Sequence, residues 1–198
     1  MKIISVITLV TISLCAGLCC TEPEDYDYNL TSIENDNIIQ IENNQNVFNV
    51  DDTIYIETLI ENQQTTTDNQ DILLSDLIDV QNTNNFLYYY LSLYKETSYG
   101  TLSKIELTPE NIDIIDGNAT IENQEIFIQN LYNGTAFKNK IGIKLLETGT
   151  FYLTGVSYNY NNSGLVNIRS ISNQGGDILI STSIINSNEN SAYQFTVN

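Results

Sequence analysis

Short segments in which apolar and polar residues alternate recur along most of this chain, and they constrain the fold more than any other feature. The clearest is 48–60, FNVDDTIYIETLI, where Ile54 and Ile56 fall on one face of a predicted strand. About ten such segments follow one another at intervals of roughly 8–14 residues. Turn signals such as Asp116-Gly117 and Asn133-Gly134 stand between them. The pattern predicts strands joined mostly by hairpins.

No long helical pattern alternates with these segments, so a parallel sheet with crossover helices is not expected. The sequence therefore predicts an all-β fold, an antiparallel immunoglobulin-like β-sandwich of about ten strands. A jelly roll or a barrel is left as an open alternative. Segment 86–94, FLYYYLSLY, carries apolar or aromatic residues on both faces and is predicted to be a central strand. Segment 71–80 fits either a short helix or a loosely packed strand.

Residues 1–19 are predicted to be a leader. Lys2 supplies a positive start, an almost unbroken apolar run follows, and the run ends at Cys19-Cys20. Residues 20–36 are polar and show no period, so they are predicted to be an acidic tether. Residues 37–198 are predicted to form a single β-sandwich domain, because their number suits one core.

All three cysteines, Cys15, Cys19 and Cys20, lie in this N-terminal region. The arrangement resembles a bacterial lipoprotein signal, in which the mature chain begins at a cysteine that carries the lipid. Cys20 is the preferred lipidation site because the small Cys19 precedes it, and Cys19 itself is the alternative. An uncleaved membrane helix is a competing interpretation, but Gly17 interrupts the apolar run and no basic residue follows it. An ordinary signal peptide is another, although it leaves the cysteine cluster unexplained.

Acidic residues follow these cysteines at once. Glu22, Glu24 and Asp25 resemble the export signal that sends Bacteroidota lipoproteins to the outer leaflet, and segment 48–55 resembles the opening strand of uncharacterised lipoproteins of that group. The chain thus resembles an uncharacterised Bacteroidota (flavobacterial-type) surface lipoprotein. The resemblance implies a place at the outer membrane, exposed at the cell surface, with acyl chains such as palmitate as the anchor. It brings no activity with it.

The chain is strongly acidic, with 25 Asp and Glu against 7 Lys and Arg and a net charge of −18. Removal of Lys2 with the leader leaves 6 basic residues and a net charge of −19. Binding of nucleic acid needs basic side chains that neutralise phosphates, so it is not expected. Attraction to anionic lipid is not expected either, which leaves the N-terminal lipid as the contact with the membrane. A surface protein or a glycan is left open as the partner.

No catalytic signature was found in the sequence. The chain contains no His, and its cysteines are confined to the N-terminal region, which removes most zinc, copper and Cys- or His-based chemistry. We therefore expect no cofactor and no enzymatic activity. Carboxylate chemistry stays open, with Asp51-Asp52 or the pair Asp113 and Asp116 as candidates. A solvated hairpin tip is expected at Gly117, with Asp113, Asp116 and Asn118 as a weak calcium candidate because they offer oxygen ligands without EF-hand spacing.

Two local patterns bear on the fold and the function. Tyr88-Tyr89-Tyr90 offers a carbohydrate-stacking or protein-binding face, although a strand with aromatics on both sides more often belongs to a core. Segment 146–153, LETGTFYL, resembles the start of the penultimate strand of immunoglobulin-like domains, where a Tyr closes a corner. Phe151 holds that position here, unless the register shifts to Tyr152.

These features predict a lipid-anchored, non-catalytic binding or accessory module with an unassigned ligand. A structural or adhesive component of a surface coat is the alternative, and a carboxylate-based glycan hydrolase is less favoured. Self-association would favour the coat component, whereas a soluble ligand would favour the binding module.

Overall fold

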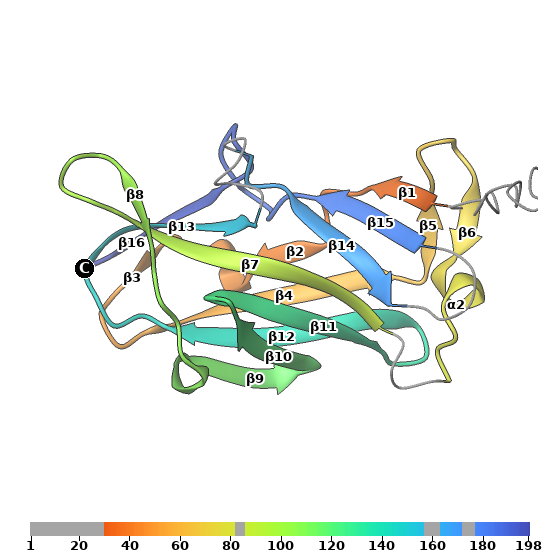
Figure 1. Ribbon diagram of the computed structural model, residues 1–198, viewed down its shortest axis with the longest axis horizontal. Helices are drawn as coiled ribbons and strands as arrows, with labels where there is room; N and C mark the ends of the chain where they lie inside the picture. Colours follow the sequence, from red (N-terminus) through yellow and green to blue (C-terminus); the bar gives the residue numbers. More distant parts are fainter. Residues whose placement is uncertain (1–29, 82–85, 157–162, 172–176) are drawn as a thin grey trace, which may run out of the picture.

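The structure is a computed structural model of the 198-residue chain, and it describes residues 30–81, 86–156, 163–171 and 177–198. The regular structure of the described chain is almost entirely strand, arranged as two layers around one core (Figure 1). We call the two layers sheet A and sheet B. Sheet A contains β1 (Leu30–Glu34), β3 (Val47–Phe48), β7 (Phe86–Glu96), β8 (Leu102–Lys104), β10 (Asn118–Glu122), β11 (Glu125–Tyr132), β13 (Gly149–Gly155), β14 (Val166–Ile171), β15 (Asp177–Thr182) and β16 (Tyr193–Val197).

Sheet B is smaller and is built around one long antiparallel pair. It contains β2 (Ile39–Ile41), β4 (Thr53–Glu61), β9 (Ile112–Asp116) and β12 (Ala136–Lys144). A separate ribbon and three short helical turns complete the fold: β5 (Gln63–Thr65), β6 (Asp71–Leu73), α2 (Leu74–Leu77), η1 (Glu42–Asn44) and η2 (Pro109–Asn111). In Figure 1, β7 and β14 of sheet A cross in front of β4 of sheet B.

The long strand β7 is the centre of sheet A. Its first residues pair with β14 and its last residues pair with β13, while β11 and β8 pair along its other edge. Across the face the strand order is β1-β15-β14-β7-β11-β10. Two strands, β15 and β1, therefore lie beyond β14 on one side of β7, and one strand, β10, lies beyond β11 on the other. The predicted central strand 86–94 is therefore confirmed.

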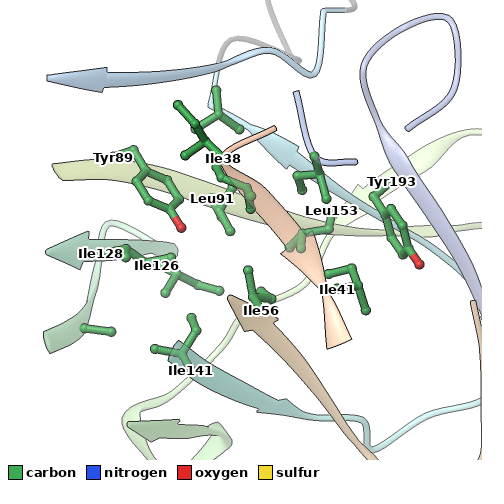
Figure 2. Packing of buried hydrophobic residues seen from close by; sticks show 14 of the residues in the cluster. Ile38, Ile41, Ile56, Tyr89, Leu91, Ile126, Ile128, Ile141, Leu153 and Tyr193 are labelled. Carbon is green, nitrogen blue, oxygen red and sulfur yellow. The ribbon is translucent and has the colours of Figure 1, made fainter. Parts of the chain in front are cut away.

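Alternation of side chains explains why the core lies between the sheets. Successive residues of a strand point to opposite faces, and β4 buries Ile54, Ile56 and Ile60 at 0–1% exposure while the residues between them are more exposed. In β7 the inward row includes Tyr89 and Leu91, which lie between the two sheets (Figure 2). The inward rows of both sheets thus fill a single hydrophobic core.

The two sheets are joined at one side by β11 itself. Its first part pairs with β7 and β10 in sheet A, and its last residues, Leu131 and Tyr132, pair with β12 in sheet B. The Asn139 side chain of β12 reinforces this corner, because its Nδ2 donates to the carbonyl oxygens of Asn118 and Gln129 at 3.0 Å each. A buried side chain thereby replaces the main-chain pairing that is lost where the strand changes sheet.

Polar contacts also cross the core and the opposite side of the sandwich. The hydroxyls of Thr58 in β4 and Tyr89 in β7 are 2.5 Å apart, and burial raises the pKa of Tyr89. On the side away from β11, Ile39 of β2 forms a bridge with Ile184, which follows β15, and the Ile185 N–H donates to the Ile39 carbonyl at 2.8 Å. The sheets are therefore connected at both sides of the core.

The prediction of an all-β, immunoglobulin-like sandwich is confirmed in that two mainly antiparallel sheets enclose one core. Two strand pairs depart from the antiparallel expectation: β1 pairs with β15, and β3 pairs with β16, in parallel. There are also more and shorter strands than the ten expected. Among the reasons, β1 and β5 form in segments expected to be tether and loop, and β3 is separate from β4.

Two sequence-based expectations are corrected by the strand positions. Strand β1 (Leu30–Glu34) falls within the segment 20–36 that was expected to be tether, so the sandwich includes residues before the predicted boundary at 37. Strand β13 is followed by three more strands and is not the penultimate one. Phe151 instead stacks on Phe195 at 5.5 Å, and the Tyr152 hydroxyl donates to Glu96 at 3.2 Å.

Candidate functional site

The outer face of sheet A carries a group of aromatic side chains that the core does not use. In β7 the inward positions hold Leu87, Tyr89 and Leu91, so the intervening side chains point to the opposite face. β11 pairs with β7 so that Phe127 lies opposite Tyr90. We call the four half-buried outward residues the aromatic patch: Phe86, Tyr88, Tyr90 and Phe127.

The rings of the aromatic patch pack against one another. Tyr90 and Phe127 have ring centroids 4.9 Å apart at an interplanar angle of 37°. Tyr88 stands at 76° to Phe86 and at 89° to Tyr90, with centroids 6.3 and 6.2 Å apart. Edge-to-face contacts of this kind are favourable for aromatic pairs and hold the rings in place. The patch is therefore a preformed cluster and does not present its rings in one plane.

A cavity adjoins the patch beside Tyr88. It has a volume of about 250 Å³ and is lined by Leu30, Tyr88, Arg169, Asp177 and Leu179, together with Ser170 and Ile178. The register places Arg169 of β14 between Tyr88 and Leu179 on the exposed face. Arg169 is the one arginine of the sequence. It forms no ion pair with any residue that the structure describes, although the chain is rich in carboxylates.

Polar side chains border the patch on its other side. Gln129 of β11 lies opposite Tyr88, and Thr120 of β10 lies opposite Phe127. The Tyr90 hydroxyl donates to Glu122 Oε2 at 3.2 Å. Burial, followed by the neighbouring Glu122 carboxylate, raises the pKa of Tyr90 because both disfavour the phenolate. The patch thus combines apolar rings with hydrogen-bonding groups at its edge.

The outer face of sheet B is different, and we call it the charged face. Lys140 Nζ lies 2.6 Å from Glu42 and 2.7 Å from Glu57, and it stands 5.5 Å from the centre of the Tyr55 ring. These hydrogen bonds raise the pKa of Lys140, and the bond from Lys140 lowers the pKa of Glu57. A groove of about 510 Å³ crosses this face and is lined by Lys138 and Lys140, and Lys140 is paired with two carboxylates.

The predicted lipidation and export residues lie outside the described part of the chain. These are Cys20, the alternative Cys19, and the acidic residues Glu22, Glu24 and Asp25. The leader, the anchor and the cellular location therefore stay predictions. Among the described residues, no helix is both long enough and apolar enough to cross a membrane.

The residues of the weak calcium candidate surround the β9–β10 turn. Asp113 and Asp116 belong to β9, Asn118 begins β10, and all three are exposed. Asp116 Oδ1 accepts a hydrogen bond from the Gly117 N–H at 2.9 Å, and the Asn118 carbonyl accepts one from Asn139. In the described ranges, no group of three or more His, Cys, Asp and Glu side chains is placed to hold a metal ion.

The other candidate acid pair also serves a turn. Asp52 Oδ2 accepts a hydrogen bond from the Asn49 N–H at 2.7 Å, and Asp51 lies 3.5 Å from Lys144. Asp51 has a φ of 72°, which is a turn conformation. These contacts account for both carboxylates as parts of the loop that leads into β4.

Sequence reasoning identified part of the aromatic patch. It named the run Tyr88-Tyr89-Tyr90 as an optional binding face and favoured a place in the core. The structure divides the run, because Tyr89 lies in the core whereas Tyr88 and Tyr90 point to the outer face. Sequence reasoning missed Phe127 and Arg169, which are about 40 and 80 residues further along the chain and reach the patch through strand pairing. Their proximity follows from the sheet order and leaves no local trace in the sequence.

Comparison with known proteins gives little further guidance. No family model and no curated protein matches the chain. Among solved structures it is similar to the type II cohesin dyad from the adaptor ScaA scaffoldin of Acetivibrio cellulolyticus, at 14% sequence identity and a TM-score of 0.37. The match covers 85% of this chain and 49% of that chain, so this chain spans about half its length. At this identity and TM-score the likeness assigns neither a family nor an activity.

Proposed function

We propose that this protein is a non-catalytic binding module, lipid-anchored at the outer membrane and exposed at the cell surface, and that the aromatic patch is its binding surface. The observation that carries the proposal is the half-exposed cluster of four rings on the outer face of sheet A. Aromatic and Arg side chains are the residues most often found where binding energy is concentrated.

The patch is not needed to complete the core. The inward row of β7 is 0–3% exposed from Leu87 to Leu93 and already contacts sheet B. On the opposite face the large rings gain their mutual contacts and partial burial, but part of their apolar area stays exposed to water. Contact with a ligand gives these rings a function that folding alone does not require.

The anchor part of the proposal is supported by the sequence. The leader ends at the cysteine pair, the preferred lipidation site is Cys20, and acidic residues follow it. Intact mass of the protein from its native membrane tests this part. A mass that fits a chain beginning at Cys20 with two or three acyl groups is expected, whereas an unlipidated or uncleaved mass would contradict the anchor.

The binding surface can be tested without knowing the ligand. We would place the photo-crosslinking residue p-benzoylphenylalanine at position 90 in the patch and, as a matched control, at position 55. Tyr55 is also a half-buried outward aromatic, but it belongs to the charged face. Irradiation of whole cells is expected to give an adduct from position 90 and not from position 55. Equal yields from both positions, or none from position 90, would refute the patch as the binding surface.

A further inference from the structure

We propose that the ligand of the aromatic patch is a neutral, soluble oligosaccharide chain, with one sugar unit in the cavity beside Arg169. This inference rests on the proposed function and specifies its ligand. It is drawn from the size of the patch, the arrangement of its rings, the groups around it and the charge of the protein.

The size of the patch favours a narrow ligand over a folded partner. Phe86 and Tyr90 are four residues apart in β7, a distance of about 13 Å. The patch and the adjoining cavity together extend over the five strands from β1 to β11, which span about 19 Å. The product, roughly 250 Å², is about a third of the 800 Å² that each partner buries in a standard protein interface. A chain of a few sugar rings covers such an area, whereas a second copy of this protein would need much more.

The arrangement of the aromatic rings favours a single soluble oligosaccharide over a flat crystalline surface. Apolar faces of sugar rings stack on aromatic rings, so a flat crystalline surface requires aromatic rings in one plane. Here Phe86 and Tyr90 stand at 76° and 89° to Tyr88, which excludes a coplanar platform. The patch matches a single chain whose successive units turn relative to one another.

The groups around the rings fit sugar hydroxyls. Gln129 and Thr120 border the patch on one side, and Arg169 and Asp177 line the cavity on the other. Arg169 supplies N–H donors and Asp177 supplies acceptor oxygens, and a sugar hydroxyl can both donate and accept. The cavity, at about 250 Å³, is smaller than the pockets that hold drug-sized ligands and suits one ring.

The charge of the protein favours a neutral oligosaccharide as the ligand. The net charge is −18, and Glu122 and Asp177 stand at the edge of the patch while Arg169 is the cation beside it. A polymer with a carboxylate or sulfate on every unit would meet repulsion that one guanidinium cannot offset. A neutral chain avoids this repulsion and should bind almost independently of salt.

The test is calorimetric titration of the mature protein with soluble hexaoses of glucose (α- and β-1,4-linked), xylose and mannose. Polygalacturonate and microcrystalline cellulose serve as the charged and the crystalline probes. At least one neutral hexaose is expected to bind, with a Kd that changes less than about twofold between 50 and 500 mM NaCl. Tyr88→Ala should weaken binding about tenfold or more, and Arg169→Gln several-fold.

Two matched controls come from the charged face. Tyr55→Ala and Lys138→Gln should leave the affinity unchanged, and urea unfolding of every variant verifies that it is folded. Failure of all four hexaoses to bind at 5 mM, tighter binding of polygalacturonate or crystalline cellulose, or equal losses in Tyr88→Ala and Tyr55→Ala would overturn the inference. A protease-sensitive adduct from position 90 with no hexaose binding would remove the sugar ligand but leave the proposed function. No adduct and no binding would remove both.

Discussion

The outer faces of the two sheets arise from the same alternation of inward and outward residues, but they carry different side chains. Strand β7 in sheet A and strand β12 in sheet B both alternate inward apolar residues with a second, outward set. On β12 the outward set is Lys138, Lys140 and Lys144, and two of these lysines form ion pairs with carboxylates of the described residues. In the first half of β7 the outward set is aromatic, and Phe86, Tyr88 and Tyr90 are partly exposed to solvent.

The comparison shows that the inner half of each strand determines the fold, whereas the outer half is free to carry function. On the charged face, lysines form ion pairs with carboxylates of the same face, as Lys140 does with Glu57. The aromatic patch contacts itself, and Arg169 beside it has no ion-pair partner among the described residues. A surface with unused donors and apolar area is the one that gains from a ligand.

The sharpest test of this division compares adjacent residues of β7. Tyr89→Ala removes a buried ring and leaves the Thr58 hydroxyl without its partner, so we expect a loss of about 3–5 kcal/mol in the free energy of unfolding. Tyr88→Ala removes a half-exposed ring and should cost about 1 kcal/mol or less. Urea unfolding measures both losses. Similar losses would mean that the outer face contributes to folding and that the comparison fails.

The next largest effect on stability is expected at the corner where β11 passes from sheet A to sheet B. Asn139→Ala removes a buried side chain and leaves the carbonyls of Asn118 and Gln129 without its amide donor, which should cost about 1–3 kcal/mol. Lys138→Ala, the outward neighbour on β12, is the control and should change the stability by about 0.5 kcal/mol or less. If both changes are equally mild, the Asn139 side chain does not hold the sheets together.

The charged face should contribute least, and its contribution should depend on pH. The pKa of Glu57 is lowered in the folded state, so its contribution is present above the ordinary carboxyl pKa of about 4.3 and is lost as the pH falls below it. Lys140→Gln should therefore cost about 0.5–1 kcal/mol at pH 7. The difference between wild type and variant should shrink at pH 3, as measured by urea midpoints. A difference that is independent of pH would exclude the ion pairs as its source.

A spectroscopic titration sharpens the description of the aromatic patch. Glu122→Gln removes the carboxylate that accepts from the Tyr90 hydroxyl, so the pKa of Tyr90 should fall toward the ordinary tyrosine value. It should stay above that value because burial, the larger cause, is unchanged. Absorbance of the phenolate against pH, with a Tyr90→Phe reference to identify the transition, makes the measurement.

The strands with strong alternation were predictable from the sequence. Ile54 and Ile56 marked β4, and the dense apolar run marked β7 as central. Strand β1 was missed because Leu30–Glu34 is mostly polar and is held by parallel pairing with β15, about 147 residues away. Strand β5, Gln63–Thr65, was missed because its sequence is typical of a loop, although Gln64 is buried.

The site was predictable only where it is local. Tyr88 and Tyr90 follow from the period of β7, but their neighbours Phe127 and Arg169 follow from the order of the strands in sheet A. The corner motif around Phe151 failed for the same reason, since a local likeness does not determine where a strand stands in the sheet. Long-range pairing is the information that one sequence does not contain.

The position of β1 has a consequence for reach. Leu30 begins this strand and also lines the cavity beside the aromatic patch. With the lipid on Cys20, the ten residues to Leu30 extend at most about 35 Å. A ligand in this cavity would then be bound within about 35 Å of the lipidated cysteine, and therefore close to the surface of the bilayer.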